Sequence, residues 1–398
     1  MTAAEAGWRG WFEGERFDWL RIAVGWTALI GHALFVAANA LVNPRVADST
    51  PAYRAAAGQW WRGEDVYGAA DLVASIFQFN NLPAHIVLFT PFWAVGQPLG
   101  GVLWRVFSIA VFAWGIARLA VLLAPHRAAV AVAIALLVVQ PSASSVFTSG
   151  QVHVVMLGFM MLAMADVAER RWTRASVWLA LAVAFKPLAI VLLLLLFAIE
   201  PAMRLRLAIA AAAVVAVPFA HPDPGFVAGQ YAVFARKMVF AAQPDTGRWA
   251  DLGTLVESTG VDFSGQFWLA VAAAGALATL ALAALARRDR DPARAALIVT
   301  VLAFAYLLLF NPRTEPNSYI ALGVLMGFGA IHLSLLSGRE GAAAAVWIAA
   351  MIVGPRGRQL DPWLLPGMAI VFLAWFLPAL WRWDGQGGGD LERADARG

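Results

Sequence analysis

Lys186 and Pro187 interrupt a run of residues, 175–199, that is otherwise almost wholly apolar. A lysine at this depth cannot face lipid cheaply, so its ammonium either extends to the membrane surface or pairs with an anion. A phosphate is a natural partner for such a cation. The proline beside it ends a helix or bends the chain. The sequence leaves both roles of Lys186 open.

The segment 311–319 is a polar island between two apolar runs and reads Asn-Pro-Arg-Thr-Glu-Pro-Asn-Ser-Tyr. The planar guanidinium of Arg313 could hold a phosphate through two parallel hydrogen bonds. Glu315, Asn317 and Tyr319 could hydrogen-bond the hydroxyl groups of a sugar. The alternative is that Arg313 and Glu315 pair with each other and only shape the turn.

Two further sets of polar residues border apolar runs. Asp48 lies a few residues beyond the run 20–42, where a rigid helix end can aim a carboxylate at the bilayer surface. Alternatively, Asp48 only caps the interfacial helix that we expect over residues 53–61. Gln151 and His153 stand at the start of another apolar run. Polar groups in that position indicate either a bound ligand or a hydrogen bond between helices.

The composition is that of an integral membrane protein. Of the 398 residues, 61% are hydrophobic and 14% are charged, and the mean hydropathy is +0.70. Soluble domains have about 45–50% apolar and about 25% charged residues. The 29 basic residues are spread over many short loops, which argues against a nucleic-acid partner. With no cysteine, no phosphate-binding GxxxxGK[ST] loop and no metal-ligand spacing, the sequence gives no sign of a cofactor.

Twelve apolar runs are expected to be membrane helices, because a bilayer core needs about 20 apolar residues per helix. They cover residues 20–42, 99–123, 128–146, 152–168, 175–186, 188–199, 207–219, 267–286, 295–310, 318–336, 342–353 and 364–380. We expect a single membrane domain over residues 1–384. The Gly-rich, charged stretch 385–398 is expected to be a disordered cytoplasmic tail.

The short apolar run 84–95 decides the orientation of the chain. Short loops rich in Lys and Arg should face the cytoplasm. All the basic loops of this chain lie on the cytoplasmic side only if the run 84–95 does not cross the membrane by itself. We therefore expect it to be re-entrant. In the alternative, it crosses the membrane and residues 175–199 form one helix.

On the preferred reading, the polar, unusual sequence lies on the exterior side. This side then holds two long segments, about 43–83 and 220–266, and short turns that contain residues 140–151, 186–187, 311–317 and 354–363. The second long segment is expected to form an amphipathic helix near residues 226–240. Its Arg236 and Lys237 are expected to touch lipid phosphates.

The order of these motifs resembles that of glycosyltransferase family 87. The likeness covers about residues 15–385. The residues that carry it are Asp48, Tyr53, Gly63 with Tyr67, Gly150-Gln151, Lys186-Pro187 and the segment 311–319. Some members of the family have a histidine-bearing motif near the late exterior turn, where this chain reads Glu315-Pro-Asn-Ser-Tyr.

The resemblance implies a polytopic GT-C fold with an active site on the exterior face, and the apolar runs predict an all-α domain with about 12 transmembrane helices (11–13). The Ala- and Arg-rich composition is compatible with a GC-rich bacterium, so we expect the protein in a bacterial plasma membrane. The donor would be a sugar, with mannose as the family's sugar, linked through phosphate to a polyprenyl lipid. The acceptor would be a lipid or a glycan, and no cofactor is required.

The resemblance also implies roles for individual residues. Asp48 would be the general base of an inverting single displacement. Lys186, Arg313 and Arg236 would stabilise the charge of the departing phosphate. The residues implied in substrate binding are Arg45, Tyr53, Gln151, His153, Glu315, Asn317 and Tyr319.

Two other classes of membrane protein are weighed against this reading. A transporter or flippase of lipid-linked sugars should show inverted repeats and helices broken at mid-membrane, and no repeat is evident in the sequence. A membrane acyl or phosphate-group transferase would use a histidine or serine near a carboxylate. His85, His153 and His221 are scattered along the chain without such a partner in the sequence.

Overall fold

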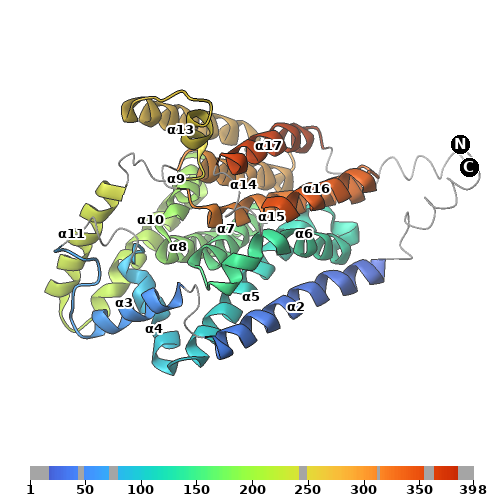
Figure 1. Cartoon of the computed structure of the whole chain (residues 1–398). Helices are drawn as coiled ribbons and strands as arrows, with labels where there is room; N and C mark the ends of the chain where they lie inside the picture. The colour runs from blue at the N-terminus through green and yellow to red at the C-terminus, as the bar shows by residue number, and fades with distance from the viewer. Residues whose placement is uncertain are drawn as a thin grey trace, which may run out of the picture.

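The protein is a bundle of long helices with a smaller group of helices at one end (Figure 1). The structure is a computed structural model that describes residues 18–43, 49–70, 79–241, 249–311, 314–353 and 363–383. Within these ranges every regular element is helical, so the predicted all-α class is confirmed. Arg45, Asp48, Arg313 and the predicted tail 385–398 lie outside the described residues.

Each of the twelve predicted apolar runs coincides with a helix. These helices are α2 (Asp18–Val42), α5 (Leu99–Leu123), α6 (Ala128–Thr148), α7 (Val152–Ala168), α8 (Trp172–Phe185), α9 (Ile190–Ile199), α10 (Arg204–Ala216), α13 (Gly265–Ala286), α14 (Pro292–Leu309), α15 (Ile320–Ile331), α16 (Glu340–Val353) and α17 (Leu364–Arg382). Single turns join or extend them, namely η2 (Pro125–Arg127), η3 (Pro187–Ala189), η4 (Pro201–Met203), η5 (Val217–Ala220), η6 (Pro316–Tyr319) and the π-helical η7 (His332–Leu336).

Eight helical stretches of the described residues are long and apolar enough to cross a membrane. They are Asp18–Val42, Leu99–Leu123, Pro125–Thr148, Pro201–Ala220, Gly265–Ala286, Pro292–Leu309, Pro316–Leu336 and Leu364–Arg382. The shorter apolar helices are α4 (Pro83–Val95), α7, α8, η3 with α9, and α16. The chain is therefore a multi-pass membrane protein.

Helix α7 forms the core of the bundle. All residues from Val152 to Val167 are buried, as expected for a helix that is apolar on every side. It crosses α5 at close range, because a Cβ atom on Gly115 would lie only 2.6 Å from the carbonyl oxygen of Gly158. Small residues at such crossings let the backbones of membrane helices touch. The outer helix α2, by contrast, leaves Leu34 65% exposed.

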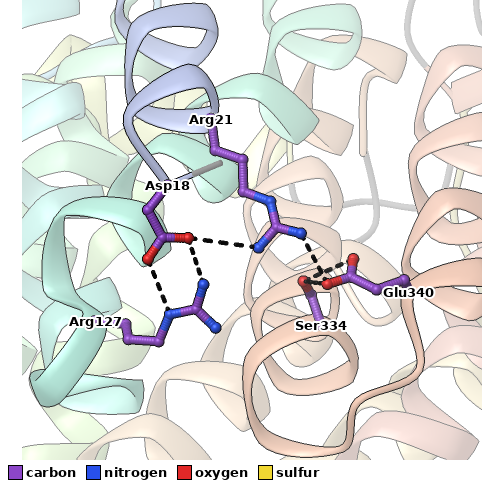
Figure 2. Close-up of polar contacts among 5 residues, drawn as sticks. All are labelled: Asp18, Arg21, Arg127, Ser334 and Glu340. Carbon is purple, nitrogen blue, oxygen red and sulfur yellow. Dashed lines mark hydrogen bonds and ion pairs between the residues drawn. The ribbon is translucent and has the colours of Figure 1, made fainter. Parts of the chain in front are cut away.

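A polar network joins three chain segments at one end of the bundle (Figure 2). Arg21 lies 3.7 Å from Asp18 and donates to Glu340 at 3.0 Å, while Arg127 donates to Asp18 through Nε at 3.2 Å. The hydroxyl of Ser334 donates to Glu340 at 2.9 Å. These contacts tie the start of α2 to the turn before α6 and to the start of α16.

Asp166 is the centre of a second network at this end. Its carboxylate is fully buried and forms ion pairs with Arg118, at 3.1 Å from Nη2, and with Arg174, at 3.2 Å from Nε. The indole of Trp178 donates a hydrogen bond to it at 2.9 Å. Glu169 also holds Arg118, at 2.8 Å. We call this the arginine end of the bundle, defined by the ion pairs of Arg21, Arg118, Arg127 and Arg174.

Helices α8 and α9 form a hairpin that turns at Lys186. Trp172 at the start of α8 and Glu200 at the end of α9 line the same cleft at the arginine end. Arg206 at the start of α10 donates to Thr173 at 3.1 Å, which places this helix start beside that of α8. The alternative of one continuous helix over residues 175–199 is therefore wrong.

Helix α4 packs beside the first turns of α5. His85 near its start and Phe92 near its end both contact the ring of Trp104, with ring centroids 6.0 and 5.4 Å apart. Gly96, with a φ of +86°, turns the chain between the two helices. Helix α4 has 13 residues, and its expected re-entrant course stays a prediction.

The predicted exterior turn 140–151 is mostly helical, because α6 continues through Pro141 to Thr148. Proline is tolerated in membrane helices where side chains satisfy nearby backbone groups. Here Gln140 donates to the carbonyl of Leu136 at 3.1 Å and Ser142 to that of Val139 at 2.9 Å. The turn is therefore limited to the residues that follow Thr148.

Helices α3 (Thr50–Trp61), α4 and α11 (Pro224–Ala241) group together at the other end of the bundle (Figure 1). The predicted helices near 53–61 and 226–240 are thus confirmed. Lys237 of α11 is buried, however, and its Nζ donates to the carbonyl of Phe79 at 2.9 Å. The expectation that Lys237 touches lipid phosphates is wrong, since it faces the segment before α4. Its neighbour Arg236 is exposed.

Candidate functional site

The turn between α6 and α7 is held by the start of α3. The amide of Ser49 donates to the carbonyl of Ser149 at 2.8 Å. The amide of Val152 donates to the hydroxyl of Tyr53 at 3.2 Å. The predicted site residue Tyr53 is therefore buried, and its hydroxyl fixes the first residue of α7. Ser49 occupies the N-cap position of α3, where one alternative placed Asp48.

Gly150 is required at the centre of this turn. Its φ of +64° lies in the left-handed region, and a Cβ atom would stand 3.0 Å from the hydroxyl oxygen of Thr50. Trp104 donates to the carbonyl of Gly150 at 2.7 Å. Arg105 is buried and donates to the carbonyl of Thr148 at 3.0 Å. A charged side chain thus supports the turn from α5.

His153 links this turn to the segment before α15. Its Nδ1 lies 3.0 Å from Oε1 of Gln151, and its Nε2 lies 3.4 Å from the hydroxyl of Ser318. Because Oε1 can only accept, Nδ1 carries the hydrogen and Nε2 accepts from Ser318. Two predicted site residues, Gln151 and His153, are therefore brought together with a serine that the sequence analysis did not single out.

Lys186 interacts electrostatically with the same cluster. It is half-buried at the end of α8, and its charge interacts with the carboxylate of Glu315 and with the rings of His85 and His153. Glu315 and Asn317 are half-buried in the turn that follows. The charge of Lys186 thus acts on polar groups of three segments, and both of its expected roles stay predictions. We call this the site end, defined by Ser149, His153, Lys186 and Ser318.

His85 was not chosen from the sequence, yet it borders the cluster. It is fully buried and packs against aromatic rings, with centroid distances of 4.8 Å to Tyr53 and 5.5 Å to Phe185. Among the described residues, neither of its ring nitrogens has a hydrogen-bond partner that meets the geometric limits. Such a buried, unsatisfied ring is unusual. Only the tertiary contacts of α4 and α8 bring it close to Lys186.

The late turn is fixed to the segment before α12 (Leu252–Glu257) by two backbone contacts. The hydroxyl of Tyr319 donates to the carbonyl of Ala250 at 2.9 Å, and the amide of Ala250 donates to the carbonyl of Thr314 at 2.7 Å. Asp251 caps α12 by accepting from the amide of Thr254 at 3.0 Å. Burial raises the pKa of Asp251, against the effect of this hydrogen bond.

The predicted site residues separate into three groups. Those brought together at the site end are Tyr53, Gln151, His153, Lys186, Glu315, Asn317 and Tyr319. Arg236 lies exposed on α11, at the same end of the bundle in Figure 1. Arg45, Asp48 and Arg313 lie outside the described residues. Their chain neighbours Ser49 and Thr314 both take part in the backbone contacts described above.

The fold and the site define a multi-pass helical membrane protein with a polar cluster at one end. Comparison with known families agrees with the resemblance in the sequence, because the model of glycosyltransferase family 87 matches residues 79–312. This is more than half of the chain, and the chain belongs to that family. No curated protein and no solved structure matches the chain.

Family membership makes the protein a membrane glycosyltransferase, an enzyme that moves a sugar from a donor to an acceptor. The transporter alternative is therefore dropped, as is the acyl or phosphate-group transferase. The matched region contains Gln151, His153 and Lys186, whereas Glu315, Asn317 and Tyr319 follow its end.

Proposed function

We propose that the enzyme transfers a hexosyl unit, mannose in the first instance, from a polyprenyl-phosphate-linked sugar to a lipid or glycan acceptor. The observation that supports this proposal is the cation Lys186 at the turn from α8 to α9, whose charge interacts with Glu315 and His153 of the site end. A cation held at this depth suits the phosphate of a lipid-linked donor. Arg313 and Arg236 are proposed to bind the same phosphate.

The other residues of the site end are proposed to bind the sugars. Gln151, His153, Glu315 and Asn317 supply hydrogen-bonding groups, and Arg45 supplies a cation near the start of α3. Tyr53 and Tyr319 use their hydroxyls to anchor Val152 and Ala250. Both rings are buried, so they support the site by fixing the segments that carry its polar side chains.

The proposed reaction is a single displacement with inversion at the anomeric carbon. Asp48 takes the proton of the acceptor hydroxyl, and the oxygen forms a bond to the anomeric carbon. The bond between that carbon and the phosphate oxygen breaks, and the lipid phosphate departs with the electron pair. Fixed cations around the phosphate lower the barrier by several kcal/mol in a site that excludes water. Phosphate is a good leaving group, so no proton donor and no metal are required.

The proposed membrane arrangement is a GT-C fold with about 12 crossings, in which the arginine end faces the cytoplasm of a bacterium. The excess of arginine at one end of the bundle supports this orientation through the positive-inside tendency. The site end then lies on the exterior side. A lipid-linked donor would reach it from the membrane.

The test is transfer of radiolabelled mannose from synthetic polyprenyl-phosphate-mannose to a membrane lipid extract. We compare wild type, Asp48→Asn and the control Asp262→Asn, which removes the charge of an exposed aspartate before α13. Loss of the base should lower the rate by about 10²–10⁴-fold, while the control keeps the wild-type rate. Equal thermal unfolding of the three proteins shows that the variants are folded.

The outcomes separate the parts of the proposal. A wild-type rate in Asp48→Asn would leave the donor correct and remove Asp48 as the base. No product from wild type, when the same extract accepts the sugar from another enzyme, would contradict the proposed donor.

A further inference from the structure

A cleft of about 230 Å³ opens at the arginine end of the bundle, between α7, α8, α9 and the turn from α13 to α14. Its polar lining comes from Arg170, Glu200, Arg287 and Asp289, and its apolar lining includes Leu196 and Val299. His153 and Arg170 stand at opposite ends of α7. At 1.5 Å per residue this separation is about 25 Å. The cleft is thus distinct from the site end.

The cleft lining carries two cations and two anions, and a third cation, Arg294, lies just outside it and pairs with one of the anions. Glu200 holds Arg287 at 3.2 Å, and Asp289 holds Arg294, just outside the lining, at 2.7 Å. This arginine also lowers the pKa of the Asp289 carboxyl, mainly by its hydrogen bond. Each of the two carboxylates is therefore paired with an arginine. Arg170 is exposed and makes no ion pair with any residue that the structure describes.

Arg170 has a left-handed backbone conformation, which residues other than glycine rarely adopt. Its φ of +57° makes it the one residue other than glycine with a positive φ among the described residues. Arg170 follows the end of α7. There the amide of Arg171 donates a hydrogen bond to the carbonyl of Asp166 at 2.7 Å and closes the helix end. Glycine is the usual residue at this position of a helix end. An arginine here costs about 1 kcal/mol that glycine would not.

The rest of the cleft lining is mostly apolar and includes Val167 of α7, Leu196 of α9 and Val299 of α14. A ligand in the cleft would therefore have its polar part near Arg170 and an apolar part against these side chains. Membrane lipids with a charged headgroup have this form, and basic pockets between membrane helices bind them.

We propose that this cleft binds the phosphate group of an anionic phospholipid, with Arg170 as its free cation. Arg287, already paired with Glu200, borders the same space and can share its remaining hydrogens. The first part of a lipid chain lies against the apolar lining from Val167, Leu196 and Val299. This site supports the fold of the membrane domain, and it does not depend on the proposed donor or on Asp48.

The test uses Arg170→Gly, because glycine fits the positive φ and the variant should fold at least as well as wild type. The matched control is Arg288→Gln, which removes an exposed arginine from the turn between α13 and α14 without touching the cleft lining. Purified proteins are placed in phosphatidylcholine nanodiscs with and without phosphatidylglycerol, and thermal unfolding is followed. Native mass spectrometry counts the phosphatidylglycerol molecules that remain bound after detergent exchange.

We expect phosphatidylglycerol to raise the Tm of wild type and of Arg288→Gln by about 2–4 °C. Arg170→Gly should show no rise and should retain one fewer lipid molecule. An equal rise in Arg170→Gly would overturn the site. So would an equal loss in Arg288→Gln, since the effect would then follow net charge. A full rise with inorganic phosphate alone, in detergent without phospholipid, would replace the lipid by a soluble anion and also overturn the proposal.

Discussion

The hydroxyl of Ser318 lies 3.4 Å from Nε2 of His153, although the two residues are 165 positions apart in the chain. This contact joins the turn before α15 to the first residues of α7. Gln151 binds the other nitrogen of the same ring, so the orientation of the imidazole is fixed from both sides. The charge of Lys186 acts on this ring and on the carboxylate of Glu315, so polar groups of three distant segments interact at the site end.

Replacement of Lys186 tests its proposed contact with the donor phosphate. Lys186→Met keeps most of the side-chain volume and removes the charge, and loss of a hydrogen bond to a charged group costs about 1.5–3 kcal/mol. We expect kcat/KM for the donor to fall by about 10–100-fold, mainly through a higher KM. Lys186→Arg should retain part of the activity. Unchanged kinetics in Lys186→Met, with normal thermal unfolding, would show that the phosphate is bound elsewhere.

Gly150 tests the fit between α3 and the turn before α7. Gly150→Ala forces a left-handed backbone on an alanine and brings its methyl group to 3.0 Å from the Thr50 hydroxyl. We expect a loss of about 1–2 kcal/mol in the free energy of unfolding. Gly31→Ala is the control, because no heavy atom lies within 4 Å of its Cβ position. Thermal unfolding should place the first variant below wild type and the second at or above it. The reverse order would argue against a strained turn.

The elements could largely be predicted from the sequence, because apolar runs between polar breaks mark membrane helices directly. The break at Lys186 and Pro187 was also visible, and the structure turns the chain there. The predicted run 128–146 ends within two residues of α6, but the expected exterior turn 140–151 was too long, because residues 140–148 are helical. Lys237 was misjudged because a pattern of charge does not say which side of a helix is covered by another segment.

The candidate site could be predicted only in part. Gln151, His153 and Lys186 stand out as polar groups in apolar surroundings, and this signal depends on the local sequence alone. His85 gives no such signal, since its position beside Tyr53 and Phe185 arises from the packing of α4 on α8 and α3. Ser318 and Arg105 acquire their roles through hydrogen bonds to residues far away in the chain. The positive φ of Arg170 cannot be read from its residue type.

Asp166 is expected to contribute to stability through its buried ion pairs. Asp166→Asn removes the charge that holds Arg118 and Arg174, whose side chains are 21% and 48% exposed. The expected loss is about 2–3 kcal/mol, below the full effect of a wholly buried pair because water reaches both arginines. Glu169→Gln, at a 33% exposed side chain, should cost less than about 1 kcal/mol. Equal effects in denaturant unfolding would contradict a special role for the buried carboxylate.

The burial of Lys237 predicts that the stability of α11 packing depends on pH. Burial lowers the pKa of its ammonium to about 8, although Asp65 opposes part of the shift. An unfolded lysine titrates near pH 10.4. Between these two values the unfolded segment binds more protons than the folded one, so stability should rise as the pH increases from about 8 to 10. Below about pH 8 both states are protonated, and this rise is absent.

The pH effect can be measured by hydrogen exchange of the α11 amides, compared between wild type and Lys237→Met at each pH. The difference between the two proteins cancels the intrinsic pH dependence of exchange. Wild type should gain protection relative to the variant above about pH 8. The same pH slope in both proteins would show that another group is responsible.

The absence of cysteine makes the orientation of the protein directly testable, because any introduced cysteine is the only thiol. Thr259 follows α12 on the side of the site end, and Arg288 follows α13 at the arginine end; both are exposed. A membrane-impermeant maleimide should label Thr259→Cys in intact cells and Arg288→Cys only after permeabilisation. This result requires that α13 crosses the membrane and that the site end faces outward. Labelling of Arg288→Cys alone in intact cells would reverse the proposed orientation, and labelling of both would mean that α13 does not cross.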